Sequence, residues 1–144
     1  MRETWVVVAD AGRARIFGLD RDTGTLAERE DFAHHEARLS ERGLVSDRQG
    51  QLTNSTGRHH AVGGEVSPRD EEDRHFAADI AGRLNHARAA GSLERIMLVA
   101  PPRFLGLLRE KLDDGTRKRV DVELALDLTA LPAEEIRERI TGRA

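Results

Sequence analysis

Apolar residues occur in short blocks along this chain, and their spacing predicts its secondary structure. Residues 5–9, WVVVA, form a continuous and largely β-branched apolar run, which is typical of a strand buried on both faces of a sheet. The stretches RARIFGL and LAEREDF follow after the polar turns DAG and DRDTGT. We therefore expect a three-strand antiparallel meander whose first strand lies near the centre of its sheet.

The second half of the chain alternates helical and strand patterns. Ser67, Pro68 and Asp70 have the composition of a helix start, with a capping hydroxyl, a proline and an early acid. Apolar residues then recur every four positions: Phe76, Ile80 and Leu84. RIMLVA predicts another buried strand, PPRFLGLLREKL a helix, VDVELAL a half-buried edge strand, and residues 132–140 a last helix.

The order of these elements, βββαβαβα, predicts the architecture. A right-handed crossover places the strand at residues 95–100 parallel to and beside the strand at residues 5–9. We therefore predict an α/β fold with a mixed five-stranded sheet in the order 3-2-1-4-5, the ribonuclease-H-like layout, with helices packed on it. The length of 144 residues, of which 38% are hydrophobic, suits a single domain over residues 1–144.

Residues 33–67 contain no convincing helix or strand pattern. This stretch is far longer than the usual connection of about 4–6 residues, and its few apolar side chains cannot offset the entropy lost on ordering. We expect a long mobile loop before the first long helix, rich in arginine yet balanced by acids. It holds most of the residues that we predict to bind a partner: Asp47, Arg48, Gln49, Arg58, His59, His60, Gly63 and Gly64.

Composition and charge limit the chemistry. The absence of cysteine excludes disulfides, zinc ribbons and thiol catalysis. The net charge of −3 gives no general attraction to nucleic acid, so any RNA contact must be local, and we expect no DNA partner. There is no apolar run of 18 residues, and MRETWVVVAD does not have the form of a signal peptide. We expect a cytoplasmic protein without a membrane partner.

The carboxylates that a ribonuclease-H-type nuclease would need form only a partial set. Such an enzyme arranges several acids around two metal ions. Asp10 follows the first strand, and Glu71, Glu72 and Asp73 open the first long helix, but the strand that ends in LVAPP adds no acid. We interpret Asp10 as a turn residue and the helix acids as partners of the helix dipole. We assign no catalytic residue.

Histidine pairs and one arginine are the remaining candidates. The side chains of adjacent residues in an extended chain point to opposite sides, so His34-His35 and His59-His60 are each more typical of solvated loop residues than of a metal site. We expect no metal and no cofactor. Arg103, in VAPPRFLG, follows a buried strand and opens a helix, a position where α/β proteins often bind anions. We include it among the partner-binding residues.

Five stretches together resemble one bacterial family. They are WVVVADAGRARIF, LVSDRQGQ, FAADIAGRLNHAR, LVAPPRFLGLLR and DLTALPAEEIRERI. The chain is similar over nearly its whole length to the host-attachment family, the proteins required for attachment to host cells. The fold of that family is similar to the middle domain of archaeo-eukaryotic release factors and Pelota, which is itself ribonuclease-H-like.

The resemblance implies a role for the long loop. In the release-factor middle domain, a loop at the same place in the topology carries a Gly-Gly-Gln tip, and this sequence has Gly63-Gly64-Glu65. The glutamate departs from the neutral amide of that motif. We therefore expect a non-enzymatic binding module that contacts the ribosome or transfer RNA through the loop. The alternatives are a ribonuclease-H-like hydrolase and a protein-interaction adaptor that acts in host-cell attachment.

Overall fold

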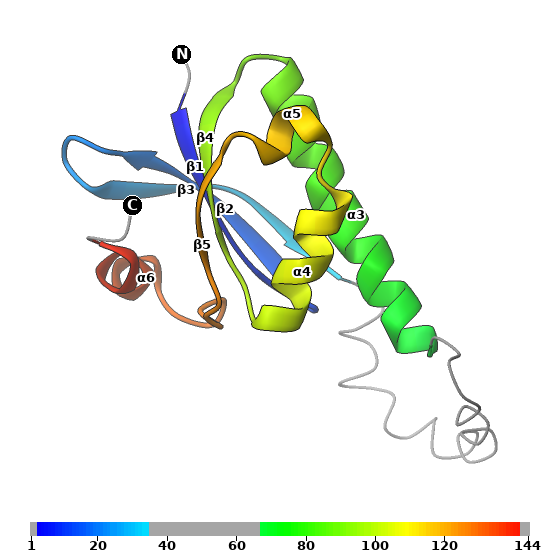
Figure 1. Cartoon of the computed structure of the whole chain (residues 1–144). Helices are drawn as coiled ribbons and strands as arrows, with labels where there is room; N and C mark the ends of the chain where they lie inside the picture. Colours follow the sequence, from blue (N-terminus) through cyan, green and yellow to red (C-terminus); the bar gives the residue numbers. More distant parts are fainter. Residues whose placement is uncertain (1–2, 35–66, 142–144) are drawn as a thin grey trace.

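Five strands form one mixed sheet in the order β3-β2-β1-β4-β5, as the sequence predicts (Figure 1). The computed structural model describes residues 3–34 and 67–141. The strands are β1 (Glu3–Asp10), β2 (Arg13–Asp20), β3 (Thr25–Ala33), β4 (Leu93–Val99) and β5 (Val120–Leu124). The first three are antiparallel, and β4 and β5 run parallel to β1.

The centre of the sheet is fixed by the apolar run that begins the chain. Val6 in β1 lies beside Phe17 in β2 and beside Met97 in β4, and none of the three side chains is more than 1% exposed. Continuous burial on both faces is what a β-branched run without polar alternation predicts. The predicted parallel pairing of the two apolar strands is therefore confirmed.

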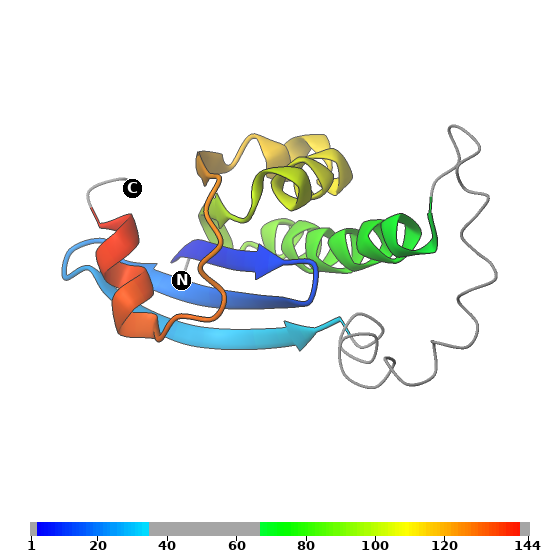
Figure 2. The ribbon, with the colours of Figure 1, turned by 90° about the horizontal axis from the view of Figure 1, so that it is seen from below.

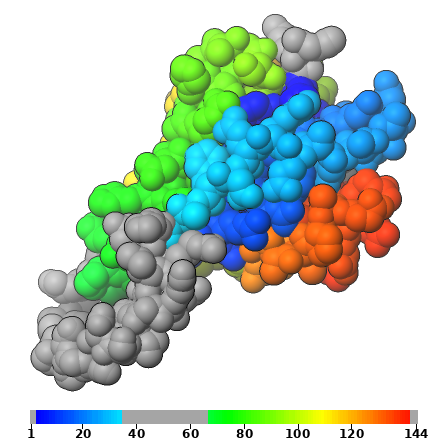
Figure 3. Space-filling view, turned by 180° about the vertical axis from the view of Figure 1, so that it is seen from behind, coloured from blue at the N-terminus to red at the C-terminus, as the bar shows by residue number. Residues whose placement is uncertain are grey.

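The two faces of the sheet are covered differently. The helices α3 (Pro68–Ala89), α4 (Pro102–Lys111) and α5 (Asp114–Arg117) pack on one face, while α6 (Ala133–Ile140) covers part of the other (Figure 2). Seen from behind, α6 lies against β3 (Figure 3). The predicted α/β architecture holds throughout the described residues. None of the described helices is both long enough and apolar enough to cross a membrane.

Local signals explain where the helices begin and end. The Ser67 hydroxyl accepts a hydrogen bond from the backbone N–H of Asp70 at 3.2 Å, so Ser67 caps α3 as predicted. Gly91 follows the end of α3 with a φ of 78°, a conformation that strongly favours glycine. The sequence patterns do not predict the single turn of α5, which Asp113 caps by accepting a hydrogen bond from the backbone N–H of Thr116.

Candidate functional site

Most of the predicted partner-binding residues cannot be placed. Segment 35–66 lies outside the described residues, and it contains Asp47, Arg48, Gln49, Arg58, His59, His60, Gly63 and Gly64. Arg103 is the predicted site residue that the structure describes. The site is therefore built from the two residues that flank segment 35–66 and from the surface around Arg103.

His34, the last described residue before segment 35–66, is held firmly against the domain. Its backbone N–H donates to the carbonyl of Gly12 at 3.0 Å, and its Nδ1 lies 2.6 Å from the carbonyl oxygen of Ala11. The imidazole stacks on the Phe76 ring with a centroid distance of 4.7 Å and is 5% exposed. Our interpretation of His34 as a solvated loop residue is wrong, because the ring packs on the first long helix.

Arg103 joins the beginnings of two helices. Its Nη1 donates to the carboxylate of Asp73 at 2.9 Å, and its Nη2 donates to the carboxylate of Asp70. Asp73 is 3% exposed, so it does more than complement the dipole of α3: it receives an arginine of α4. Ser67, which follows segment 35–66, caps the same helix end. Arg103 therefore lies close to the point where that segment rejoins the domain.

A groove of 540 Å³ extends from Arg103 between α3, α4 and α5. Residues 103, 106, 107 and 110 of α4 line it because their spacing places them on one side of a helix. Phe104, Leu105 and Leu108 point into the core and fix that orientation. Four arginines line the groove: Arg74, Arg103, Arg109 and Arg117.

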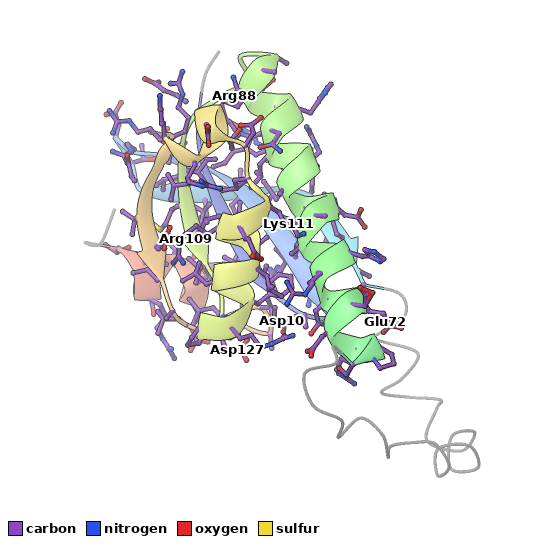
Figure 4. All side chains as sticks on the ribbon, turned by 45° about the vertical axis from the view of Figure 1, so that its right-hand side comes forward. Asp10, Glu72, Arg88, Arg109, Lys111 and Asp127 are labelled. Atoms are coloured by element: carbon purple, nitrogen blue, oxygen red, sulfur yellow. The ribbon has the colours of Figure 1, made fainter. Side chains whose placement is uncertain are left out.

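The stretch that carries most of this groove is positively charged within a negatively charged chain. Residues 103–119 contain six basic and three acidic side chains, a net charge of +3, whereas the whole chain carries −3. Figure 4 shows Arg109 and Lys111 on α4, with Arg88 near α5 on the same side of the molecule. The groove therefore carries a local excess of positive charge, and Arg103 is the one of its four arginines that the sequence analysis names as a candidate.

Carboxylates partner the groove arginines with unequal strength. Arg109 donates to Glu123 of β5 through both Nε and Nη2, and this hydrogen-bonded pairing raises the pKa of Arg109. Arg74 has a looser ion pair, 3.6 Å from Glu110. Arg117 lies 3.8 Å from Asp114 and also donates to the backbone carbonyls of Arg109 and Leu112 at 3.1 and 3.0 Å. The side chains of Arg74, Arg109 and Arg117 are roughly half exposed, so exchange of their carboxylates for another anion costs little, whereas Arg103 is held by the buried Asp73.

A second pocket, of 390 Å³, opens where the β1–β2 turn meets the residues that follow β4 and β5. Its lining residues are Asp10, Ala11, Gly12, Arg13, Pro101, Thr129 and Ala130. Figure 4 places Asp10 at the same end of the molecule as Glu72, near the start of α3. Asp10 accepts hydrogen bonds from the Gly12 backbone N–H and from the Thr129 hydroxyl, both at 2.8 Å. Asp10 ends β1 and its carboxylate caps the turn that follows, and it also holds the chain after β5.

Arg15 supports this pocket from beneath and is a functional candidate that the sequence motifs do not single out. Its Nη1 donates to the carbonyls of Thr129 and Leu131 at 2.9 and 2.6 Å, while Nε and Nη2 donate to Glu28. The hydrogen bond with Arg15 lowers the pKa of Glu28, and the same bond raises the pKa of Arg15. The alternation of β2 carries the signal, since Arg15 shares a side of the strand with the buried Phe17.

The nuclease carboxylates do not gather among the described residues. Asp10 ends β1 and caps the turn to β2, and Asp73 is paired with Arg103. Within residues 3–34 and 67–141, no three histidine, aspartate or glutamate side chains lie close enough to share a metal ion.

Three solved structures resemble the domain at low sequence identity. An archaeal protein matches with a TM-score of 0.50 and 10% identity over 97% of this chain and 33% of its own. An archaeal translation termination factor matches with a TM-score of 0.47 and 10% identity, over 97% and 38%. A Ppx/GppA phosphatase of Aquifex aeolicus matches with a TM-score of 0.41 and 12% identity, over 86% and 35%. The chain thus spans about a third of each structure, and the first likeness concerns the fold alone.

Sequence comparison identifies the family directly. No curated protein matches the chain significantly. The model of one family, described as "Protein required for attachment to host cells", matches residues 5–140, which is nearly the whole chain. This range includes the strands of the sheet, the groove arginines and the pocket at Asp10. The chain therefore belongs to the host-attachment family, the proteins required for attachment to host cells.

Proposed function

We propose that this protein is a binding module for ribosomal or transfer RNA, and that the groove between α3, α4 and α5 is its contact with the phosphate backbone. The observation that carries the proposal is the net charge of +3 over residues 103–119 in a chain of net charge −3. The groove concentrates this charge in four arginines within a concave surface of 540 Å³. An anionic polymer is the ligand that such a surface attracts.

The side-chain type favours RNA over an acidic protein. A guanidinium binds a phosphate through two parallel hydrogen bonds and can also stack on an unpaired base. Arg74 has one loose ion pair and can turn toward a ligand with little loss, whereas Arg117 also donates to the backbone carbonyls of Arg109 and Leu112 and is held more firmly. A protein partner remains the alternative, and we expect a protein-interaction adaptor to bind without the steep dependence on salt that phosphate contacts impose.

Segment 35–66 adds to this surface in our proposal. It rejoins the domain at Ser67, which caps the same helix whose first turn receives Arg103. Any ligand held at the Arg103 end of the groove is therefore within reach of residues near that junction. Arg48 and Arg58 would contact phosphates or bases, and Gln49 would supply hydrogen bonds.

The family description names a phenotype, attachment to host cells, and no molecular partner. An RNA-binding module can influence such a phenotype through the expression of surface proteins. An adaptor would instead act by direct protein contact. The two proposed functions therefore differ in the ligand of the purified protein, which is RNA for the binding module and another protein for the adaptor.

Ribosome cofractionation on a sucrose gradient, with and without added salt, tests the proposal. We expect the parent protein to sediment with ribosomal particles at low salt, and the Arg48→Ala/Arg58→Ala variant to shift toward the top of the gradient. The matched control is Arg137→Ala/Arg139→Ala, which removes two arginines of α6 on the opposite face of the sheet. No association of the parent at low salt, or equal loss in both variants, would favour the adaptor.

A further inference from the structure

The pocket at Asp10 lies at a position in the sheet where α/β proteins commonly bind ligands. From β1 the chain turns to β2 on one side, whereas from β4 it continues through α4 and α5 to β5 on the other. Two adjacent parallel strands whose connections leave in opposite directions create a crevice at their carboxyl ends. Asp10 and Pro101 follow β1 and β4 into this crevice, and both line the 390 Å³ pocket.

The walls of the pocket are held by hydrogen bonds at buried and half-buried positions. The Thr129 side chain donates to Asp10, and its backbone carbonyl accepts from Arg15, which is 7% exposed. Glu28 receives two further hydrogen bonds from Arg15 at 2.9 and 3.0 Å. The turn after β1 is thereby tied to the chain after β5. A pocket formed in advance loses little entropy when a ligand enters it.

Two lining side chains keep unused hydrogen-bonding capacity. A carboxylate accepts about four hydrogen bonds, and Asp10 receives two within the described residues. Arg13 is 38% exposed at its side chain and has one loose ion pair, 3.5 Å from Asp31. The pocket thus presents an acceptor for hydroxyl groups beside a cation for an anionic group.

We propose that this pocket binds the ribose phosphate unit of a ribonucleotide. In this arrangement the ribose hydroxyls donate to Asp10, as an acidic residue commonly holds a ribose in dinucleotide-binding folds, and the phosphate pairs with Arg13. The unit can come from a free nucleotide or from the end of an RNA chain. The site is separate from the groove of arginines and does not depend on it.

The lining also sets the expected selectivity. Among the described residues around the pocket, none is aromatic and none carries a side-chain amide. Base stacking and base-edge recognition need such groups. We therefore expect similar affinity for nucleotides of all four bases, together with a preference for ribose over deoxyribose.

Titration of the purified protein with AMP and with its 2′-deoxy counterpart tests the proposal, with calorimetry for affinity and the amide NMR signal of Gly12 for location. We expect AMP to bind about tenfold more tightly than the deoxynucleotide, since one hydrogen bond to a charged group is at stake. AMP and UMP should bind alike. No shift of the Gly12 signal at millimolar AMP, or equal affinity for the two sugars, would overturn the assignment.

Two variants separate the two contacts. Asp10→Asn keeps an acceptor for the Gly12 N–H and should bind AMP no better than the deoxynucleotide. Arg13→Gln should weaken both nucleotides about tenfold or more and keep the sugar preference. If Asp10→Asn lowers the melting temperature, the Arg13→Gln variant still tests the site. Unchanged AMP affinity of the Arg13→Gln variant would contradict the proposal.

A short RNA then identifies the source of the ligand. An RNA pentanucleotide that displaces AMP from the Gly12 signal assigns the pocket to RNA ends, and one that leaves the signal unmoved assigns it to free nucleotides. The Arg109→Ala/Arg117→Ala variant should bind AMP as the parent does, because neither arginine lines this pocket. Failure of AMP binding would therefore leave the proposed RNA function of the groove intact.

Discussion

Two regions of this domain use the same pair of groups, guanidinium and carboxylate, in opposite surroundings. Beneath the Asp10 pocket, the Arg15 side chain is 8% exposed and is bound to Glu28 and to two backbone carbonyls. Along the groove, the side chains of the four arginines are 41–52% exposed. The first arrangement fixes two parts of the fold to each other, and the second leaves charge at the surface.

The two regions show that a buried arginine stabilises the fold, whereas an exposed arginine is available to a ligand. A buried ion pair that loses one partner leaves an uncompensated charge, which is strongly destabilising. An exposed pair contributes about 0–1 kcal/mol, so its partners can be exchanged at little cost. The comparison predicts that substitutions around Arg15 affect folding and that substitutions in the groove affect binding.

The largest expected effect on stability is that of replacing Arg15. Arg15→Leu leaves Glu28, whose side chain is 35% exposed, and two backbone carbonyls without their donor, and it should lower the free energy of unfolding by about 1–3 kcal/mol. Urea denaturation measures the change. The double variant Arg15→Leu/Glu28→Leu should recover part of this loss, because it removes the unpaired charge as well. A single-variant loss below about 0.5 kcal/mol would place Arg15 with the surface pairs.

Arg103 allows both surroundings to be compared on one residue. Its two partners are Asp73, whose side chain is 4% exposed, and Asp70, whose side chain is 41% exposed. Asp73→Ala should cost about 1–3 kcal/mol of unfolding free energy, because a charged hydrogen bond in a buried place is lost. Asp70→Ala should cost less than about 1 kcal/mol. Equal losses in thermal or urea denaturation would remove the distinction between the two regions.

Acid should lower the free energy of unfolding through the Arg15–Glu28 pair, with a smaller effect than these substitutions. The hydrogen bond from Arg15 lowers the folded-state pKa of Glu28, so this pair contributes stability above the unfolded-state pKa, about 4.3. That contribution is lost as the pH falls through the lower folded-state value. Between pH 5 and pH 3 the parent should therefore lose more unfolding free energy than Glu28→Gln. Parallel stability curves would contradict the role of the pair.

The smallest expected effect is that of the groove on folding. Arg109→Ala/Arg117→Ala removes two largely solvated side chains and should change the unfolding free energy by less than about 1 kcal/mol. Differential scanning calorimetry tests this. A larger loss of unfolding free energy would mean that the groove arginines stabilise the fold, and it would argue against their role in binding.

Much of the fold can be predicted from the sequence because its strongest signals are local and repetitive. The apolar run at residues 5–9 and its counterpart near residue 97 specify two central strands, and the handedness of the crossover places them side by side. Ser67 and Pro68 mark the start of α3 in the same way. The single turn of α5 has no periodicity to detect, since one turn is shorter than any repeat.

The candidate site is less predictable because it depends on contacts between distant residues. Arg15 and Thr129 are 114 positions apart, and no local sequence pattern predicts the hydrogen bond between them. Arg74 and Arg117 likewise share one groove only after α4 and α5 have packed on α3. Arg103 could be singled out because it opens a helix after a buried strand, but its two carboxylate partners follow from the tertiary fold.

RNA affinity as a function of salt concentration tests whether the groove arginines contact phosphates. Fluorescence anisotropy with a labelled ribosomal RNA fragment should give, for the parent, a logarithm of affinity that falls linearly with the logarithm of salt concentration. For Arg109→Ala/Arg117→Ala we expect weaker binding and a slope shallower by about 1–2, because each lost phosphate contact reduces the slope by about one. Arg137→Ala/Arg139→Ala should match the parent. An unchanged slope in the groove variant, or identical losses in both variants, would contradict the account.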